Sequence, residues 1–198
     1  MIFGGRMKRQ KRMAQVADPL VHKSKLMITE LLKAKLGKET EYPVEVLWFS
    51  MWLVYLGFST AKPNPSKKEE QSLNDAYNQL FVNLGMDDYE TSGMKSKTNI
   101  QGYAIFFARD LMERFMARCS EYNDAFNQDK GASFLVPEED FSEFVPFNLL
   151  SLAIPNIYGK EYKISDPSEL DKNFVFGFMD FFNNTLNEVT NNFQNFSL

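Results

Sequence analysis

The chain has 198 residues, of which 44% are hydrophobic, 15% aromatic and 24% charged, and this balance excludes the weakly hydrophobic, highly charged class of disordered proteins. A chain of this length can bury a substantial core, so we expect one globular domain. The net charge of −4 conceals an uneven distribution, because residues 1 to 38 contain ten Lys and Arg but two acids, whereas residues 39 to 198 contain twelve Lys and Arg and twenty-four acids.

Residues 1 to 19 are predicted to form a basic N-terminal arm in front of a helical domain of residues 20 to 198. Five cations fall within seven residues of this arm: Arg6, Lys8, Arg9, Lys11 and Arg12. They could neutralise the phosphates of a nucleic acid, contact an anionic lipid surface or an acidic protein, or remain a solvated tail, and the sequence leaves these alternatives open. No aromatic residue lies among them, so stacking on bases is not indicated.

The helical domain is predicted to begin with a helix over residues 20 to 36 that stops at Gly37, since apolar residues recur there at helical spacing. A second helix begins near Pro43 and runs to Gly57, with an acid in its first turn where the macrodipole favours one.

An uncharged stretch of this second helix, Val46 to Phe58, contains both tryptophans of the chain. A membrane span needs about 20 apolar residues, and this stretch is shorter, so we interpret it as a core helix surrounded by other elements. Two alternatives are an aromatic surface for a partner subunit, formed by Trp48, Trp52 and Tyr55, and insertion into a membrane.

The sequence Ser66-Lys67-Lys68-Glu69 has the form of a capping box and predicts a third helix that ends at Gly85. A polar loop is expected from residue 86 to residue 98, and the longest helix from Asn99 to about Phe126. Its polar face pairs Arg109 with Glu113 and Asp110 with Arg114 at i,i+4 spacing.

Residues 134 to 158 contain three prolines, which favours two short helices. Asp166-Pro167-Ser168-Glu169 is a start signal for a terminal helix whose apolar side reaches Phe193. Alternating strands and internal repeats are not evident. We therefore predict an all-α fold, a single domain of about five to seven helices.

The residues that usually carry chemistry are few in this chain. His22 is the sole histidine and Cys119 the sole cysteine, which excludes a disulfide within the chain and a multi-histidine metal site. We interpret His22 as a surface residue and Cys119 as an inert core thiol.

Two acidic clusters are interpreted structurally, Asp87-Asp88-Tyr89-Glu90 as a solvated loop and Glu138-Glu139-Asp140 as a helix N-terminus. No glycine-rich phosphate loop is present. We predict no catalytic residue, no cofactor and no metal site.

The C-terminal tail places Phe193, Phe196 and Leu198 among polar residues. Large apolar side chains of this kind are normally buried, so they either fold back on the domain or dock on another chain, and the sequence favours neither.

These features indicate a non-enzymatic helical structural or adaptor subunit of a larger assembly, such as a virion or connector protein or an accessory subunit of a large complex. Its contacts would be the basic arm and the phenylalanine tail, and its partners other protein subunits in a homo- or hetero-oligomer. The alternative is a nucleic-acid-associated protein that uses the arm, and the third is an enzyme that gathers acids such as Asp110, Glu113 and Glu121 into a cleft.

We expect no membrane span and no secretion, because no apolar signal region follows the basic N-terminus. The single cysteine indicates a reducing setting, which is the cytoplasm or the interior of a virion or large complex.

Overall fold

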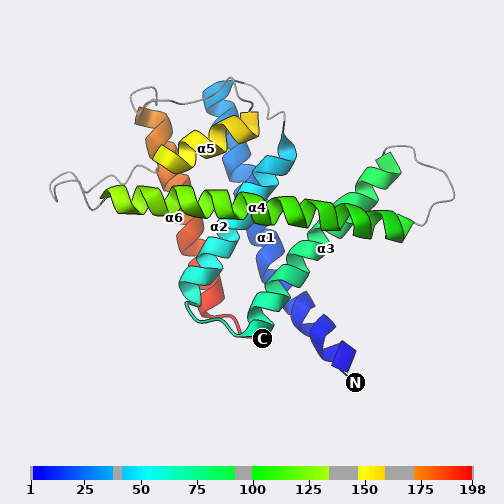
Figure 1. Cartoon of the computed structure of the whole chain (residues 1–198). Coiled ribbons are helices and arrows are strands. Elements are labelled where there is room, and N and C mark those ends of the chain that lie inside the picture. Colours follow the sequence, from blue (N-terminus) through cyan, green and yellow to red (C-terminus); the bar gives the residue numbers. More distant parts are fainter. Residues whose placement is uncertain (1, 38–41, 92–99, 134–146, 159–171, 198) are drawn as a thin grey trace.

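The computed structural model describes residues 2–37, 42–91, 100–133, 147–158 and 172–197. Within these residues the fold contains six helices and no strand (Figure 1). The prediction of an all-α domain with five to seven helices is therefore confirmed. The helices are α1 (Ile2–Leu36), α2 (Pro43–Ala61), α3 (Lys67–Thr91), α4 (Ile100–Ser133), α5 (Phe147–Tyr158) and α6 (Lys172–Gln194).

Helix α2 lies at the centre of the arrangement and contacts α1, α4, α5 and α6. The long helix α4 crosses the front of the molecule in Figure 1, and α3 packs against both α4 and α1. The N-terminal part of α1 and the C-terminal end of α6 both lie at the lower side of the molecule. A helix that has neighbours on several sides must be apolar on several sides, which explains the composition of α2.

The uncharged stretch of α2 forms part of the core, as the sequence predicts. Trp52 is fully buried and lies 5.3 Å from Tyr122 and 5.5 Å from Phe49, measured between ring centroids. Its indole Nε1 donates a hydrogen bond of 2.9 Å to Oδ1 of Asn123 on α4. Trp48 is also buried, at 5% exposure, whereas Tyr55 is 40% exposed, so the proposed aromatic surface of three residues does not exist as a unit.

The predicted stretch is too short to span a membrane, but helix α2 is longer than that stretch. Helix α2 has 19 residues, a mean hydropathy of 1.3 over its most apolar window, and 61% of that window is buried inside the fold. By length and composition it could cross a bilayer, and the mostly buried core helix of a soluble protein meets the same test. The absence of a membrane span therefore stays a prediction, supported by the burial of α2 and not by its length.

Helix α1 is much longer than the predicted helix of residues 20 to 36. It begins at Ile2 and contains Pro19 in its interior. Met13 and Ala17 are fully buried, so apolar packing continues well upstream of residue 20 and keeps this part of the chain helical. The predicted stop at Gly37 is confirmed: its φ is 70°, and its N–H donates to the carbonyl of Lys33 at 2.9 Å.

The other two glycines that were expected to end helices lie inside them. Helix α2 continues past Gly57 to Ala61, and α3 continues past Gly85 to Thr91, so the first residues of the predicted loop 86–98 are helical. A Cβ added at Gly85 would lie 3.0 Å from the Cα of Ala104 on α4. These glycines allow close approach of a neighbouring helix, which is why they do not act as stops.

The capping box at the start of α3 is confirmed. The backbone N–H of Ser66 donates to Oε2 of Glu69 at 2.9 Å, and the N–H of Glu69 donates to Oγ of Ser66 at 3.3 Å. Hydrogen bonds from the backbone and hydroxyl of Ser66 lower the pKa of Glu69.

The later helices differ from prediction in their ends. Helix α4 runs to Ser133 and not to about Phe126, and residues 147 to 158 form one helix, α5, that contains Pro155. Its N-terminus is capped from α4: the carboxylate of Asp129 accepts backbone N–H bonds from Asn148 at 2.8 Å and Leu149 at 2.9 Å. The first part of the proline-divided segment and the Asp166 start signal lie outside the described residues.

The contact at Gly57 yields a test of the packing between α2 and α6. A Cβ at this position would lie 2.4 Å from Cγ1 of Val189, which is fully buried. Gly57→Ala is therefore expected to lower the free energy of unfolding by about 1 to 3 kcal/mol, although the same change in an open helix raises it by roughly 0.5 to 1 kcal/mol. Chemical denaturation measures the difference.

Gly5→Ala is the matched control, because the nearest atom to its added Cβ is the flexible Nη1 of Arg9 at 3.4 Å. It should not destabilise the fold. Val189→Gly combined with Gly57→Ala should cost less than the sum of the two single substitutions, since the Cγ1 at 2.4 Å and the Cβ at 2.7 Å from the added methyl group are then both absent. Equal stability of Gly57→Ala and the wild type would contradict the close contact.

Candidate functional site

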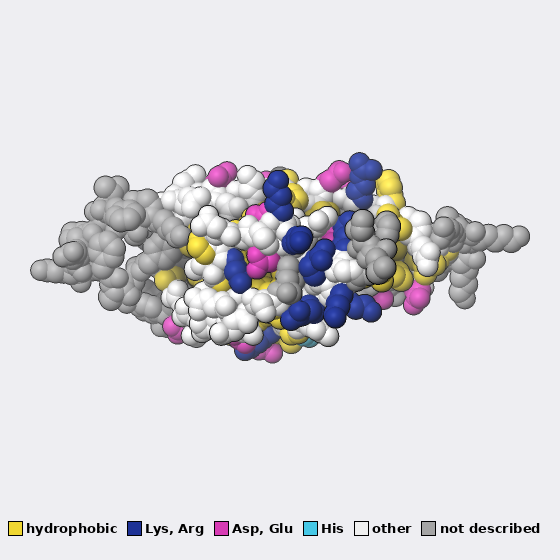
Figure 2. Space-filling model, turned by 90° about the horizontal axis from the view of Figure 1, so that it is seen from below, with side chains coloured by type: hydrophobic (Ala, Val, Ile, Leu, Met, Phe, Trp, Pro, Cys, Tyr) yellow, Lys and Arg dark blue, Asp and Glu magenta, His cyan; other side chains and the backbone are white. Residues whose placement is uncertain are grey.

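Cationic side chains gather at the lower end of the molecule. The N-terminal part of α1 and the first turn of α3 both lie at this end in Figure 1, and the view from below shows Lys and Arg side chains over it (Figure 2). The cations of these two segments, which we call the basic face, are Arg6, Lys8, Arg9, Lys11, Arg12, Lys67 and Lys68. The five residues expected to form an interaction arm thus lie on the N-terminal part of α1, which packs against α3, the helix that carries the two lysines.

The basic face is held on a packed helix. Arg6 donates two hydrogen bonds to the carboxylate of Asp75 on α3, at 2.7 and 2.8 Å, and this contact raises the pKa of Arg6. Gln10 donates to the backbone carbonyl of Asp75 at 3.1 Å. Met13 and Ala17 of the predicted arm are buried in the core. The cations are therefore carried by a helix that is packed against the rest of the fold.

The remaining cations of α1 stand close to one another. Lys8 precedes Lys11 and Arg12 by three and four residues, and none of these three has an ion pair within the part of the chain that the structure describes. Like charges at these spacings on a helix destabilise it by about 0.2 to 0.5 kcal/mol per pair. The first turn of α1 contains no acid to offset them. An external anion would relieve this repulsion.

The phenylalanine tail is folded back on the chain's own core, one of the two arrangements left open by the sequence. Phe193 is fully buried, and its ring lies 5.2 Å from that of Phe58. Phe196 is partly buried against the core, and its carbonyl accepts a hydrogen bond of 2.9 Å from Nζ of Lys62. Leu198 lies outside the described residues. In this conformation Phe193 has no surface to offer to a partner.

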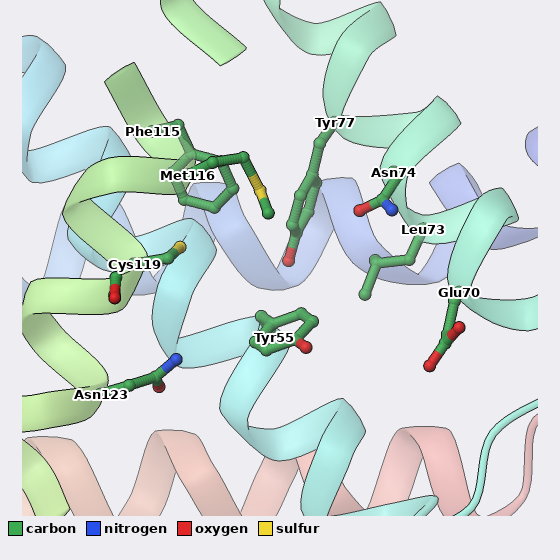
Figure 3. A pocket seen from close by; sticks show the side chains of 10 residues that line it. Tyr55, Glu70, Leu73, Asn74, Tyr77, Phe115, Met116, Cys119 and Asn123 are labelled. Carbon is green, nitrogen blue, oxygen red and sulfur yellow. The ribbon is translucent and has the colours of Figure 1, made fainter. Parts of the chain in front are cut away.

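A cavity of about 400 Å³ lies between α2, α3 and α4 (Figure 3). Its walls combine aromatic and aliphatic side chains with a few polar groups, and its charged lining residue is Glu70. The residues around it are Tyr55, Glu70, Leu73, Asn74, Tyr77, Phe115, Met116, Cys119, Ser120 and Asn123. Sequence analysis missed this site, because its members come from three helices and share no local spacing.

The two reactive residue types have the positions that were expected. Cys119 is 7% exposed, and burial raises the pKa of its thiol to about 12, so at neutral pH it remains protonated and unreactive. His22 is exposed on α1. Neither residue has the partners that nucleophilic catalysis requires within the described part of the chain.

The acids that were considered for a cryptic active site do not converge. Asp110 and Glu113 lie on the exposed side of α4, where the predicted pairs with Arg114 at 3.0 Å and Arg109 at 3.2 Å are present. Glu121 pairs with Arg118. Asp88 accepts a hydrogen bond from the Tyr103 hydroxyl at 2.6 Å.

Among the residues that the structure describes, no group of three His, Cys, Asp or Glu is placed to hold a metal ion. The second acidic cluster, residues 138 to 140, lies outside them. That the chain is not an enzyme stays a prediction.

A largely buried ion pair joins α2 to α4 and was not anticipated. Arg118 donates to both carboxylate oxygens of Glu45, at 2.9 and 3.1 Å. Burial raises the pKa of Glu45, although the guanidinium of Arg118 opposes this shift. The sequence indicated only the helix-start position of Glu45, because its partner is 73 residues away.

No protein-family model matches the chain, and no curated protein or solved structure is similar to it. Functional inference therefore depends on the basic face, the cavity and the charges described above.

A buried carboxyl close to the basic face provides a test of the electrostatics of α1. Asp18 is half-buried, its Oδ1 has no hydrogen-bond partner among the described residues, and burial raises its pKa to about 6. Between about pH 4 and 6 the folded state holds a proton that the unfolded state has released, so stability falls as the pH rises through this window. Asp18→Asn should therefore raise the free energy of unfolding at pH 7.5 by about 1 kcal/mol, since partial exposure limits the cost of the charge.

At pH 3.5 the same substitution should leave stability nearly unchanged, because Asp18 is then protonated in both states. Denaturant titrations at the two pH values measure this difference. Asp124→Asn on the exposed side of α4 is the control and should have little effect at either pH. A stabilising effect of Asp18→Asn that is equal at both pH values would contradict the assignment.

Proposed function

We propose that the chain is a non-enzymatic helical structural or adaptor subunit that docks on an acidic partner surface through the basic face. The observation that carries this proposal is the set of neighbouring, exposed cations on α1 that have no ion pairs in the described structure although their mutual repulsion weakens the helix. Residues that reduce local stability are commonly retained for a function.

The anchoring of α1 strengthens this proposal. Because Met13 and Ala17 are buried and Arg6 binds Asp75, the backbone that carries the cations is already ordered before a partner binds. The fully buried Phe193 leaves the basic face, and not the C-terminal tail, as the contact surface. A reducing setting such as the cytoplasm or the interior of a larger particle fits the single, buried cysteine.

The partner is proposed to be another protein subunit with a cluster of Asp and Glu. Charge complementarity of this kind accelerates association and gives specificity, and it weakens as salt screens the charges. A second copy of the chain satisfies the same requirement, because residues 39 to 198 carry twice as many acids as cations.

Charge reversal on α1 tests the proposal. Lys8→Glu/Arg12→Glu is expected to abolish capture of protein partners from the native source, and any assembly larger than a monomer, because it inverts the charge at the centre of the α1 cations. Pull-down with mass spectrometry and size-exclusion chromatography with light scattering provide the readouts. The wild-type complex should dissociate as the salt concentration rises.

The matched control is Arg109→Glu/Arg114→Glu, which reverses two exposed arginines on α4 and should retain the partner. The free energy of unfolding of Lys8→Glu/Arg12→Glu should stay within about 0.5 kcal/mol of wild type, since Lys8 and Arg12 are exposed and their i,i+3 neighbours become oppositely charged. A monomer that captures nothing at low salt would contradict the proposal.

A nucleic-acid-associated function is the second candidate. It is favoured by Lys67 and Lys68, two further exposed cations on α3, which packs against α1. Contacts between such cations and phosphates release counterions and bind without reading sequence.

Fluorescence anisotropy with labelled duplex DNA and RNA tests this second function. Binding should weaken steeply with salt, and both Lys8→Glu/Arg12→Glu and Lys67→Glu/Lys68→Glu should reduce it, since each removes phosphate contacts. Deletion of residues 1 to 12 would also abolish the contacts that Arg6 and Gln10 of α1 make with Asp75 of α3. The charge-reversal variants are therefore the better test. Binding that survives both reversals would exclude the basic face as a nucleic-acid site.

A further inference from the structure

We propose that the cavity between α2, α3 and α4 is a binding site for a small organic cation with an apolar body, such as an aryl-alkyl ammonium compound. None of the cations of the basic face lines this cavity, and the proposal does not rest on the adaptor function. Its volume of about 400 Å³ falls within the roughly 300 to 1,000 Å³ that small-molecule pockets occupy.

The floor of the cavity would hold the apolar body of the ligand. Leu73 is 1% exposed, Tyr77 1% and Phe115 2%, and the rings of Tyr77 and Phe115 meet edge to face at 5.7 Å. Met116, on the opposite side, extends its thioether into the space in Figure 3. Such a floor releases water when an apolar group enters.

The charge of the lining residues favours a cationic ligand over an anionic one. Glu70 is the ionised residue among the ten that line the cavity, and it has no ion pair within the described chain. Lys, Arg and His are missing from that lining. A bound anion would thus lose its hydration and find no positive charge in the cavity. A bound cation would pair with the carboxylate of Glu70.

Aromatic rings add to this preference. Tyr55 is 40% exposed and reaches into the cavity from α2, with the ring of Tyr77 across the space from it (Figure 3). The negative face of an aromatic ring attracts an ammonium group, most strongly where water is partly excluded. The exposed carboxylate of Glu70 and the partly exposed ring of Tyr55 are the groups available to an ammonium group, while Tyr77, at 1% exposure, remains part of the floor.

Polar groups of the core hold the walls in place. The hydroxyl of Tyr77 donates to the carbonyl of Met51 at 2.8 Å, and Asn123 accepts from the indole of Trp52 at 2.9 Å. These bonds fix two lining residues before a ligand arrives, which lowers the entropic cost of binding. The exposed Asn74 and Ser120 leave the cavity open to solvent on one side.

Three probes of similar size and different charge test the proposal: 2-phenylethylammonium, neutral 2-phenylethanol and anionic 3-phenylpropanoate. The full chain, labelled with ¹³C at its methionine methyl groups, provides the readout by NMR. Met116 lines the cavity, and Met7 of α1, which is similarly exposed at 58% against 55%, is the internal control. The ammonium probe should shift the Met116 signal, assigned with Met116→Leu, and leave that of Met7 unchanged.

The dissociation constant of the ammonium probe should be lower than that of the neutral probe. Glu70→Gln should raise it by about two- to fivefold, as expected for loss of one exposed ion pair. Binding of the neutral probe should remain nearly unchanged in this variant. Tyr55→Leu should also weaken the binding of the ammonium probe more than that of the neutral probe, because the aromatic ring face is then absent.

Glu30→Gln, which removes an exposed carboxylate of α1 outside the cavity, serves as the charge control and should bind like the wild type. Circular dichroism of each variant checks that the fold is retained. The proposal would be overturned by an unchanged Met116 signal with all three probes, by equal affinity for the neutral and cationic probes, or by tighter binding of the anion.

Discussion

The fold depends on the burial of the aromatic side chains of α2. Eleven of its nineteen residues are buried, among them Trp48, Phe49 and Trp52. Each large side chain contributes roughly 1.5 to 3 kcal/mol when it leaves water, so a helix of this composition is stable only when other helices cover it. Helices α1, α4, α5 and α6 pack around α2 and shield it from water. Helix α3 packs on the outside of this group, against α1 and α4.

Polar contacts then fix how the surrounding helices sit. Arg118 of α4 binds Glu45 at the start of α2, and Asn123, further along α4, accepts the indole hydrogen bond of Trp52. Tyr77 of α3 donates to the backbone of α2 at Met51. Since Asn123 and Tyr77 also line the cavity, the hydrogen bonds that orient the core shape the proposed cation site as well. The site is therefore a consequence of how three helices are held apart and not of any one sequence motif.

The two proposed sites have opposite electrostatic character. On α1, neighbouring cations repel one another and are retained by apolar packing at Met13 and Ala17 and by the Arg6–Asp75 pair. In the cavity, Glu70 is an exposed lining residue with no cation in the lining. An acidic partner would neutralise the first site and a small cation the second. The two sites share no residue, so Lys8→Glu/Arg12→Glu on α1 and Tyr55→Leu in the cavity each change one site only.

The sequence by itself determined the cap at Ser66 and the stop at Gly37, because each follows from interactions among near neighbours. It also determined the helical class and the core position of Trp52, which follow from the local apolar content. It also indicated the five cations of α1, although it could not show that they lie on a packed helix. Tertiary structure alone decided the roles of Gly57 and Gly85, which resemble helix stops locally but permit close contact with α6 and α4. It likewise decided the capping of α5 by Asp129, the Glu45–Arg118 pair and the cavity around Glu70. These features join residues on different helices, and no spacing along the chain records which helices will meet.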